Sequence, residues 1–329
     1  DKELILKAFN LAKDAHADVR RKSGEPYILH PIEVASIVAR EIGLGPTSVA
    51  AALIHDVVED SDYTLEDIDR LFGEEIARII DGLTKISGIF DQDISLQAEN
   101  FRKMLLTLSD DIRVILIKLA DRLHNMRTME SMPTHKQVKI ASETLYLYAP
   151  LAHRIGLYNI KTELEDLSLK YTEPEVYRDI VLNIKSSEAG EAKYLSQFAS
   201  VLKKDLKKAG LDFTIKQRAK SIYSIRKKML KQGVSFNQVY DRFAIRIILD
   251  TPEEREKSEC WRAYSIVTDS YRPNPERLRD WISSPKANGY ESLHTTVMGS
   301  DGQWVEVQIR SARMDEIAEK GYAAHYKYK

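Results

Sequence analysis

The chain has 329 residues, which is enough for two domains that each bury a core of their own. Its content of 43% hydrophobic and 30% charged residues is typical of a soluble globular protein. The net charge of −1 excludes a protein that binds polyanions through its overall field, so a role of that kind would need local basic patches.

The sequence shows no signal for export or for insertion into a membrane. Residues 1–7 are charged and lack the apolar core of a signal peptide, and apolar runs such as 114–117 are too short to span a bilayer. The single Cys260 cannot form an internal disulfide, which suits a reducing compartment. We therefore expect a cytoplasmic protein without membrane contacts.

The first half of the chain repeats apolar residues at helical spacing and shows no alternation typical of strands. Thr47 or Ser48 can cap a helix that we expect to carry His55. Thr64 followed by Asp67 resembles a capping box that opens a further helix. This half is therefore predicted to be all-helical.

After Gly210 the pattern changes to alternating and β-branched runs, which predict strands at 213–217, 243–249, 293–298 and 304–310. Helical patterns lie between the strands at 221–232 and 258–270, and another begins at Ala312. We predict an α+β fold with two domains, an all-helical domain over 1–153 and a mixed-sheet domain over 200–329. Residues 154–199 are predicted to form a helical linker that couples them.

Two histidines and two aspartates stand out as a candidate metal site. His30, the adjacent pair His55 and Asp56, and Asp121 together suit a divalent ion of the manganese, iron or zinc group. Apolar neighbours surround the pair, and the apolar run 114–120 precedes Asp121, so we expect these polar groups to be partly buried. A single histidine or aspartate is more often structural, and only the combination favours ligation.

Two further carboxylates are expected beside this site. On one helix, Glu59 lies one turn after His55, and Asp60 lies one turn after Asp56. Carboxylates in these places can orient or deprotonate a water molecule. The pattern therefore indicates metal-assisted hydrolysis of a phosphoester.

The set of two histidines and two aspartates resembles the signature of the HD phosphohydrolase superfamily. Longer strings resemble the RelA/SpoT family of alarmone synthetase-hydrolases over nearly the whole chain. In the first half these strings are Arg-Lys-Ser-Gly-Glu-Pro-Tyr (21–27), His-Asp-Val-Val-Glu-Asp (55–60), Gln-Ala-Glu-Asn-Phe-Arg-Lys-Met (97–104) and Leu-Ala-Asp-Arg-Leu-His-Asn-Met-Arg-Thr (119–128).

This resemblance implies an HD-type domain that removes pyrophosphate from the 3′ position of ppGpp or pppGpp. It implies that Mn²⁺ is held by His30, His55, Asp56 and Asp121, and that Glu59 and Asp60 activate water. The residues implied to contact the guanosine nucleotide are Arg21, Lys22, Ser23, Asn125 and Thr128. Charge alone favours a solvated patch at Arg20–Lys22, but the turn Gly24–Pro26 beside it, which leads to His30, favours a binding role.

A second candidate site lies in the second half. Residues 203–231 hold eleven Lys or Arg and two Asp, which by itself describes a solvated basic helix. Its cations also cluster where a helix begins, however, as a triphosphate site would require. In 304–310, alternation puts Glu306, Gln308 and Arg310 on one strand face, either as a plain solvent-facing side or as a site. Asp241 at a strand start suits Mg²⁺.

The second half resembles the synthetase domain of the same family, at 218–221, 241–246, 285–290, 292–295 and 306–310. The resemblance implies a nucleotidyltransferase-like fold that transfers pyrophosphate from ATP to the 3′-hydroxyl of GDP or GTP. It implies Mg²⁺ ligation by Asp241 and Glu306, with Glu306 also activating the hydroxyl. The nucleotide-binding residues that it implies are Arg218, Lys220, Ser221, Lys227, Arg246, Lys286, Asn288, Tyr290 and His294.

The family's short charge motif falls at Arg277–Asp280, where Arg279 keeps the positive charge typical of bifunctional members. Because arginine and lysine are not equivalent donors, this departure leaves metal preference open. Long family members continue beyond the catalytic region. The resemblance therefore implies regulatory C-terminal domains and the ribosome as partners of a full-length protein.

Two other functions compete with a bifunctional alarmone enzyme. The first is a hydrolase whose second domain is a nucleotide-binding regulatory module. The second is a module that binds RNA or the ribosome through 203–231, with affinity that falls steeply with salt. Acidic residues elsewhere and the lack of paired stacking aromatics disfavour direct nucleic-acid binding.

Overall fold

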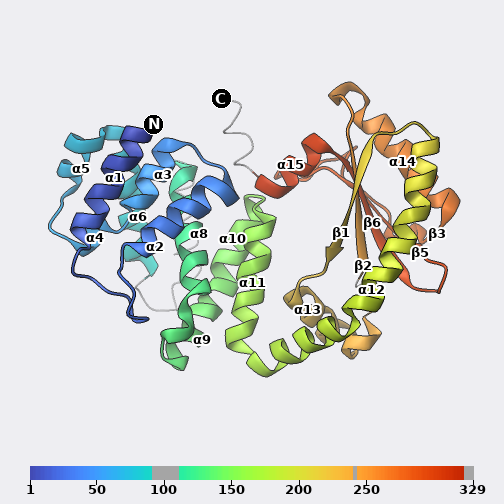
Figure 1. The fold of residues 1–329 in the computed structure, drawn as a ribbon, viewed down its shortest axis with the longest axis horizontal. Coiled ribbons are helices and arrows are strands. Elements are labelled where there is room, and N and C mark those ends of the chain that lie inside the picture. Colours follow the sequence, from blue (N-terminus) through green and yellow to red (C-terminus); the bar gives the residue numbers. More distant parts are fainter. Residues whose placement is uncertain (91–110, 240–242, 322–329) are drawn as a thin grey trace. The chain divides into compact units, whose positions relative to one another are not determined.

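The computed structural model describes residues 1–90, 111–239 and 243–321 (Figure 1). Contacts divide the chain into two compact units, one formed by Asp1–Ala152 and one that begins at His153. The predicted string 97–104 and the predicted metal ligand Asp241 lie outside the described residues. The domain boundaries predicted at 153 and 199 stay predictions.

The first unit is built from helices, and its described residues contain one isolated bridge, Arg20 to Pro26, but no strand. The all-helical prediction is therefore confirmed for these residues. The elements are α1 (Lys2–Ala15), α2 (Leu29–Ser36), η1 (Ile37–Ile42), α3 (Pro46–Leu53), α4 (Val57–Asp60), α5 (Leu65–Phe72), α6 (Glu74–Phe90), α8 (Ile112–Arg127), η3 (Met129–Ser131), α9 (Thr134–Glu143), η4 (Thr144–Tyr148) and α10 (Ala149–Arg154), which crosses the division between the units.

Helix α8 lies at the centre of this unit and contacts α2 and α6. Ten of its sixteen residues are buried, including Leu116 and Ile117. A helix with most of its residues buried is enclosed by others on more than one side. Asp121, a polar residue on this helix, is therefore held in place by the surrounding core.

The start and end of α3 differ from the prediction. Gly45 is the N-cap and Pro46 the first helical residue, so neither Thr47 nor Ser48 caps the helix. The helix ends at Leu53, and His55 lies in the turn that leads to α4. The expectation that His55 lies on a regular helix is wrong, because the helix stops before it.

The predicted capping box at the start of α5 is confirmed. The Thr64 hydroxyl accepts a hydrogen bond from the Asp67 backbone N–H, and the Asp67 carboxylate accepts one from the Thr64 backbone N–H. These two bonds satisfy donors that would otherwise be unpaired at the helix start.

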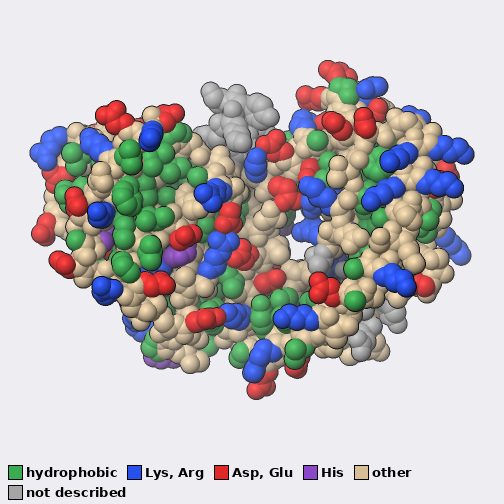
Figure 2. All heavy atoms as spheres, in the orientation of Figure 1, with side chains coloured by type: hydrophobic (Ala, Val, Ile, Leu, Met, Phe, Trp, Pro, Cys, Tyr) green, Lys and Arg blue, Asp and Glu red, His purple; other side chains and the backbone are tan. Residues whose placement is uncertain are grey.

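Charged side chains of both signs are interspersed over the faces of the two units that Figure 2 shows. This distribution fits the net charge of −1. Among residues 1–90, 111–239 and 243–321, no helix is both long and apolar enough to cross a bilayer.

The second unit contains α11 (Tyr158–Thr172), α12 (Pro174–Lys208), α13 (Ile222–Gln232), α14 (Glu256–Ser270) and α15 (Ala312–Lys320). Its short helical turns are η5 (Phe236–Gln238), η6 (Glu253–Arg255) and η7 (Pro275–Arg277). Its strands are β1 (Phe213–Ala219), β2 (Phe243–Leu249), β3 (Arg272–Pro273), β4 (Arg279–Asp280), β5 (Leu293–Met298) and β6 (Trp304–Ser311). The four predicted strands and the three predicted helices are confirmed, whereas β3 and β4 were not predicted.

The strands form one mixed sheet in the order β1-β2-β6-β5-β3, with β4 also paired to β5. The central strands β2 and β6 are parallel, and the other neighbours are antiparallel. A mixed sheet with helices was predicted, and this topology confirms it.

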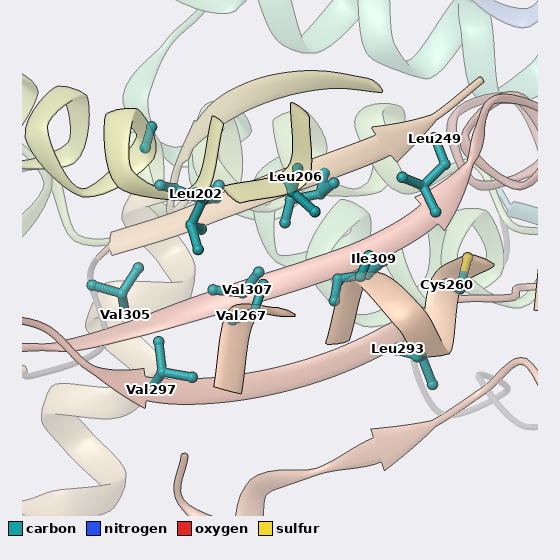
Figure 3. Close-up of a cluster of buried hydrophobic side chains, with 14 of the residues drawn as sticks. Leu202, Leu206, Leu249, Cys260, Val267, Leu293, Val297, Val305, Val307 and Ile309 are labelled. Atoms are coloured by element: carbon teal, nitrogen blue, oxygen red, sulfur yellow. The ribbon is translucent and has the colours of Figure 1, made fainter. Parts of the chain in front are cut away.

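One face of the sheet is apolar and packs against α12 and α14. Figure 3 shows side chains from β2, β5 and β6 meeting Leu202 and Leu206 of α12 and Cys260 and Val267 of α14. Because side chains alternate along a strand, the residues between these apolar ones point to the other face. The alternation therefore fixes which side chains can build a site on the uncovered side.

Candidate functional site

Three separate elements of the first unit bring the candidate metal ligands together. His30 is the second residue of α2, His55 and Asp56 lie in the turn between α3 and α4, and Asp121 lies on α8. The ligand atoms of the first three all lie within 4.8 Å of one another. Asp121 Oδ1 lies 3.2 Å from His30 Nε2 and 3.9 Å from His55 Nε2. The structure thus brings all four together.

Opposite charges stabilise each other in this cluster. Burial favours the neutral form of His55, but the charge of Asp56 outweighs it and raises the histidine pKa to about 9. Burial likewise opposes ionisation of Asp56, yet His55 lowers the Asp56 pKa to about 2. For Asp121, burial is outweighed by Lys118, whose ammonium lies 3.0 Å from Oδ2 and holds the Asp121 pKa well below its usual value. Both carboxylates are therefore ionised at neutral pH.

The side-chain geometry fits a divalent cation. His55 Nε2 is buried and has no partner in hydrogen-bonding geometry, although Asp56 Oδ2 lies 3.0 Å away. On the other side of the ring, Nδ1 lies 2.8 Å from the Ala52 carbonyl oxygen, to which it can only donate. In the neutral ring, this bond leaves the lone pair on Nε2, and a cation bound there would take the place of the proton that Asp56 otherwise favours.

A pocket of about 760 Å³ lies beside these ligands, and Asp121 lines it. Four of the predicted nucleotide-binding residues line the same pocket, namely Arg21, Lys22, Asn125 and Thr128. Arg21 donates to the Asn125 side-chain oxygen over 3.1 Å. The fifth residue, Ser23, is exposed and is not among the lining residues.

The two predicted water-activating carboxylates lie on the exposed side of α4. Glu59 and Asp60 are both exposed, and neither lines the pocket. Asp60 is close enough to His16 and Tyr27 to influence the pKa of each.

Sequence reasoning missed Tyr27 and His124, which contact the cluster directly. The Tyr27 hydroxyl donates to Asp56 Oδ2 over 2.6 Å, and His124 Nδ1 lies 2.7 Å from His30 Nδ1. The helical spacing offered a signal for one of them, because His124 follows Asp121 by three residues and so shares its face. Tyr27 lies on an irregular segment, where spacing carries no such signal.

In the second unit, the uncovered face of the sheet carries the predicted synthetase residues. The pairing register aligns Arg218 with Ala244 and Glu306 across β1, β2 and β6. Two residues further along β2, Arg246 aligns with Gln308 of β6, which in turn aligns with His294 of β5. The structure thus gathers these side chains on one face, opposite the apolar core.

Glu306 lies among potential donors on this face. Its Oε1 accepts a hydrogen bond from Gln308 over 2.8 Å and lies 3.6 Å from His294 Nδ1. Its Oε2 lies 3.5 Å from Lys220 Nζ. Burial lowers the pKa of His294 to about 4 despite the charge of Glu306, so the ring is neutral at pH 7.

Tyr290 lies beside His294, which is near Glu306, and so connects Glu306 to the other residues predicted to bind the acceptor nucleotide. Its hydroxyl lies 2.8 Å from His294 Nε2, and the Lys286 ammonium lies 4.8 Å from the centre of its ring. The Asn288 amide donates to the Tyr158 hydroxyl over 2.8 Å, and the Tyr158 ring meets Tyr290 edge-on. The predicted residues of the segment 285–290 are therefore close together, with the Tyr290 ring itself buried.

A second pocket, of about 630 Å³, contains three predicted phosphate-binding residues, Arg218, Lys220 and Ser221. Ser221 is the N-cap of α13, and its hydroxyl accepts from the Ser224 N–H. Lys227 is exposed and does not line this pocket.

Arg246 is directed at carboxylates of α15. Its Nη1 lies 2.7 Å from Glu319 Oε1 and 3.2 Å from Asp315 Oδ1. The fully buried Arg310, which sequence reasoning placed on this face without a role, also pairs with Asp315. Burial of two guanidinium groups requires such partners.

An acidic side chain of α11 occupies the start of α13. The Asp166 carboxylate accepts a hydrogen bond from the Tyr223 N–H over 2.8 Å and lines the second pocket. Burial raises the pKa of Asp166 to about 6, although this hydrogen bond favours the ionised form. No sequence pattern indicated this contact, because it joins residues 57 positions apart.

We predict a pH dependence of stability from Asp166. The Asp166 carboxyl binds its proton more tightly in the folded chain than in the unfolded chain, where its pKa is near 3.8, so its contribution to the free energy of unfolding should fall as pH rises from 3.8 to about 6. Asp166→Asn should flatten this fall, and Asp179→Asn, an exposed control on α12, should not. Urea unfolding midpoints measured across this pH range test it, and equal slopes in wild type and Asp166→Asn would contradict it.

Two known protein families match the chain, one in each of its two units. The HD domain family matches residues 8–158, and the family described as the region found in RelA/SpoT proteins matches residues 217–329. The first match covers the histidine and aspartate cluster. The second covers most of the sheet and its polar face.

Curated relatives resemble the chain along nearly all of its length. A probable guanosine-3′,5′-bis(diphosphate) 3′-pyrophosphohydrolase of Synechocystis sp. is 46% identical over 99% of this chain and 42% of its own. A GTP pyrophosphokinase of Myxococcus xanthus is 44% identical over 100% and 43%. The bifunctional (p)ppGpp synthase/hydrolase SpoT of Escherichia coli is 43% identical over 99% and 46%.

The chain spans less than half the length of these relatives. Its two matched regions occur in the order HD domain, then RelA/SpoT region. Both regions, and an identity of 43–46% along 99% or more of the sequence, show that the chain belongs to the RelA/SpoT family.

Proposed function

We propose that the chain is the catalytic region of a bifunctional alarmone enzyme. One unit removes the 3′-pyrophosphate of (p)ppGpp to give GDP or GTP. The other transfers pyrophosphate from ATP to the 3′-hydroxyl of GDP or GTP and releases AMP. The observation that carries the proposal is the presence of two separate polar sites, the cluster around His55 and the sheet face around Glu306.

In the hydrolase unit, His30, His55, Asp56 and Asp121 would hold Mn²⁺. The ion supplies a Lewis acid, which makes water a stronger nucleophile at neutral pH and polarises a phosphoryl oxygen. Arg21 at the pocket wall offsets phosphate charge, Lys22, Asn125 and Thr128 of the same wall place the nucleotide, and the exposed Ser23 beside them contacts it from outside the wall. Glu59 and Asp60 take up the proton of the attacking water, with their exposed position giving the proton a path to solvent.

In the synthetase unit, Glu306 accepts the proton of the 3′-hydroxyl as that oxygen attacks the β-phosphorus of ATP. Asp241 and Glu306 would hold Mg²⁺, which neutralises phosphate charge. Phosphate contacts come from Arg218, Lys220, Ser221, Lys227 and Arg246. The neutral His294, with Lys286 and Asn288, lines the acceptor side, where the Tyr290 ring, buried in this structure, would stack on guanine once uncovered.

Arg246 already has ionic partners in Glu319 and Asp315. Phosphate oxygens bound there would replace carboxylate oxygens of similar charge and geometry. The proposal therefore includes a change of partner at Arg246 when ATP binds.

The test is to incubate the purified chain with Mn²⁺ and ppGpp, and separately with Mg²⁺, ATP and GDP, and to resolve the nucleotides by chromatography. Release of GDP in the first reaction and of AMP and ppGpp in the second supports the proposal. GDP release without synthesis would favour a nucleotide-binding regulatory role for the second unit. Absence of both would refute the proposal.

A nucleic-acid module is the weaker alternative. Of the basic segment 203–231, Arg218 and Lys220 line a pocket and Arg226 pairs with Glu173. These side chains are thus engaged within the unit. The expected setting is the cytoplasm, and the ribosome as a partner stays a prediction.

A further inference from the structure

The candidate ligand Asp56 is held from outside the cluster by a tyrosine. The Tyr27 hydroxyl donates to Oδ2, the oxygen that also faces His55 Nε2 at 3.0 Å and His30 Nε2 at 3.7 Å. A carboxylate oxygen has two lone pairs, so it can accept this bond and still bind a cation.

Tyr27 itself has little freedom to move. Its ring lies on the buried His16, with the ring centres 4.6 Å apart, and its edge meets His30 at 5.7 Å. Its backbone N–H donates to the Val19 carbonyl over 2.9 Å. A fixed donor restricts the terminal torsion of Asp56, which is otherwise broad in aspartates.

A histidine plays the equivalent part for His30. A metal-binding Nε2 must carry a lone pair, so Nδ1 of His30 must carry the proton and donate it. Two side chains lie within reach of Nδ1 in the described part of the chain, His124 Nδ1 at 2.7 Å and Arg21 Nη1 at 3.3 Å. Arginine can only donate, so His124 is the acceptor.

Arg21 supports this assignment. Its Nη1 also lies 3.2 Å from His124 Nδ1, and its Nη2 donates to the Asn125 oxygen. Arg21 then has two acceptors, His124 Nδ1 and the Asn125 oxygen, and its 3.3 Å approach to the protonated His30 Nδ1 is a contact between two donors and not a hydrogen bond. If Nε2 of His30 faces the cation, the donor and the acceptor of each hydrogen bond among His30, His124, Arg21 and Asn125 are determined.

We propose that Tyr27 and His124 are positioning residues of the metal site. The Tyr27 hydroxyl sets the orientation of Asp56, and His124 Nδ1 fixes the tautomer of His30. The inference rests on the proposed cation site of the hydrolase unit. Outer partners of metal ligands typically change metal affinity by about 10–100-fold when they are replaced.

The decisive measurement is the binding of Mn²⁺ to the whole chain in the absence of nucleotide. Electron paramagnetic resonance monitors this binding. Tyr27→Phe keeps the ring on His16 and removes one oxygen atom, and it should weaken Mn²⁺ binding by about 10–100-fold. Tyr146→Phe makes the same change at a side chain 68% exposed in the same unit and should leave binding unchanged.

His124 is tested with a pair of variants. His124→Leu removes the acceptor and should weaken Mn²⁺ binding by about 10–100-fold, whereas His124→Gln offers an amide oxygen and should restore most of it. Spin-echo spectra should show two coordinated imidazoles in wild type and His124→Gln, and one in His124→Leu. A merely structural role would not change this number.

The outcomes separate the two claims. If the wild-type chain does not bind Mn²⁺, the proposed cation site fails. If wild type binds and both Tyr27→Phe and His124→Leu bind equally well, the positioning roles are wrong. Circular dichroism checks the fold, and should His124→Leu lose helix content, Tyr27→Phe and His124→Gln decide.

Discussion

Asp56→Ala is expected to abolish ppGpp hydrolysis, by about 10³-fold or more, and to leave synthesis from ATP and GDP unchanged. Asp56 Oδ2 lies 3.0 Å from His55 Nε2, and its charge is the largest influence that raises the His55 pKa. Without it, the cluster loses one of two carboxylates that offset the charge of a divalent cation. Chromatography of both reactions with the same preparation measures the change.

Asp69→Ala is the matched control, because Asp69 is an exposed carboxylate of α5 in the same unit. Both activities should survive in it. Loss of synthesis together with hydrolysis in Asp56→Ala would mean that the two reactions are assigned to the wrong units. Unchanged hydrolysis would remove Asp56 from the metal site.

Glu306→Gln is expected to lower pyrophosphate transfer by about 10²–10⁴-fold and to leave hydrolysis unchanged, because an amide cannot take up the proton of the 3′-hydroxyl. Glutamine has nearly the shape of glutamate and its oxygen can still accept from Gln308, so the sheet should keep its structure. Initial rates of AMP formation measure the effect.

The control here is Glu254→Gln, at an exposed residue of η6, and it should synthesise ppGpp at the wild-type rate. A Glu306→Gln variant with normal synthesis would leave the second unit as a nucleotide-binding regulatory module. Normal nucleotide affinity with lost turnover would place Glu306 in the chemical step.

The regular elements were predictable because their apolar residues repeat at helical or strand spacing. The strand around Val307 alternates cleanly, the strand around Ile245 is a β-branched apolar run, and the sheet buries both residues. The two-residue strands β3 and β4 could not be predicted, because two residues contain no period. The end of α3 was missed for a related reason, since the segment 50–54 is apolar throughout and marks no helix terminus.

The candidate metal ligands were predictable from residue type and from resemblance, but their partners were not. Tyr27 reaches Asp56 across 29 positions, and Asp166 reaches Tyr223 across 57. Such contacts depend on tertiary packing, which a local pattern does not contain. The ionic partners of Arg246 likewise come from α15, far along the chain.

The parallel pairing of β2 with β6 has a consequence for how the protein is made. The two central strands are separated by the whole segment 250–303, so their pairing closes a long loop, which is slow. During translation the N-terminal helices emerge first and can collapse on one another while β6 is still unsynthesised. We therefore expect the sheet to mature after the helices of the first unit, and its unpaired β2 edge to be where aggregation begins if elongation stalls before β6.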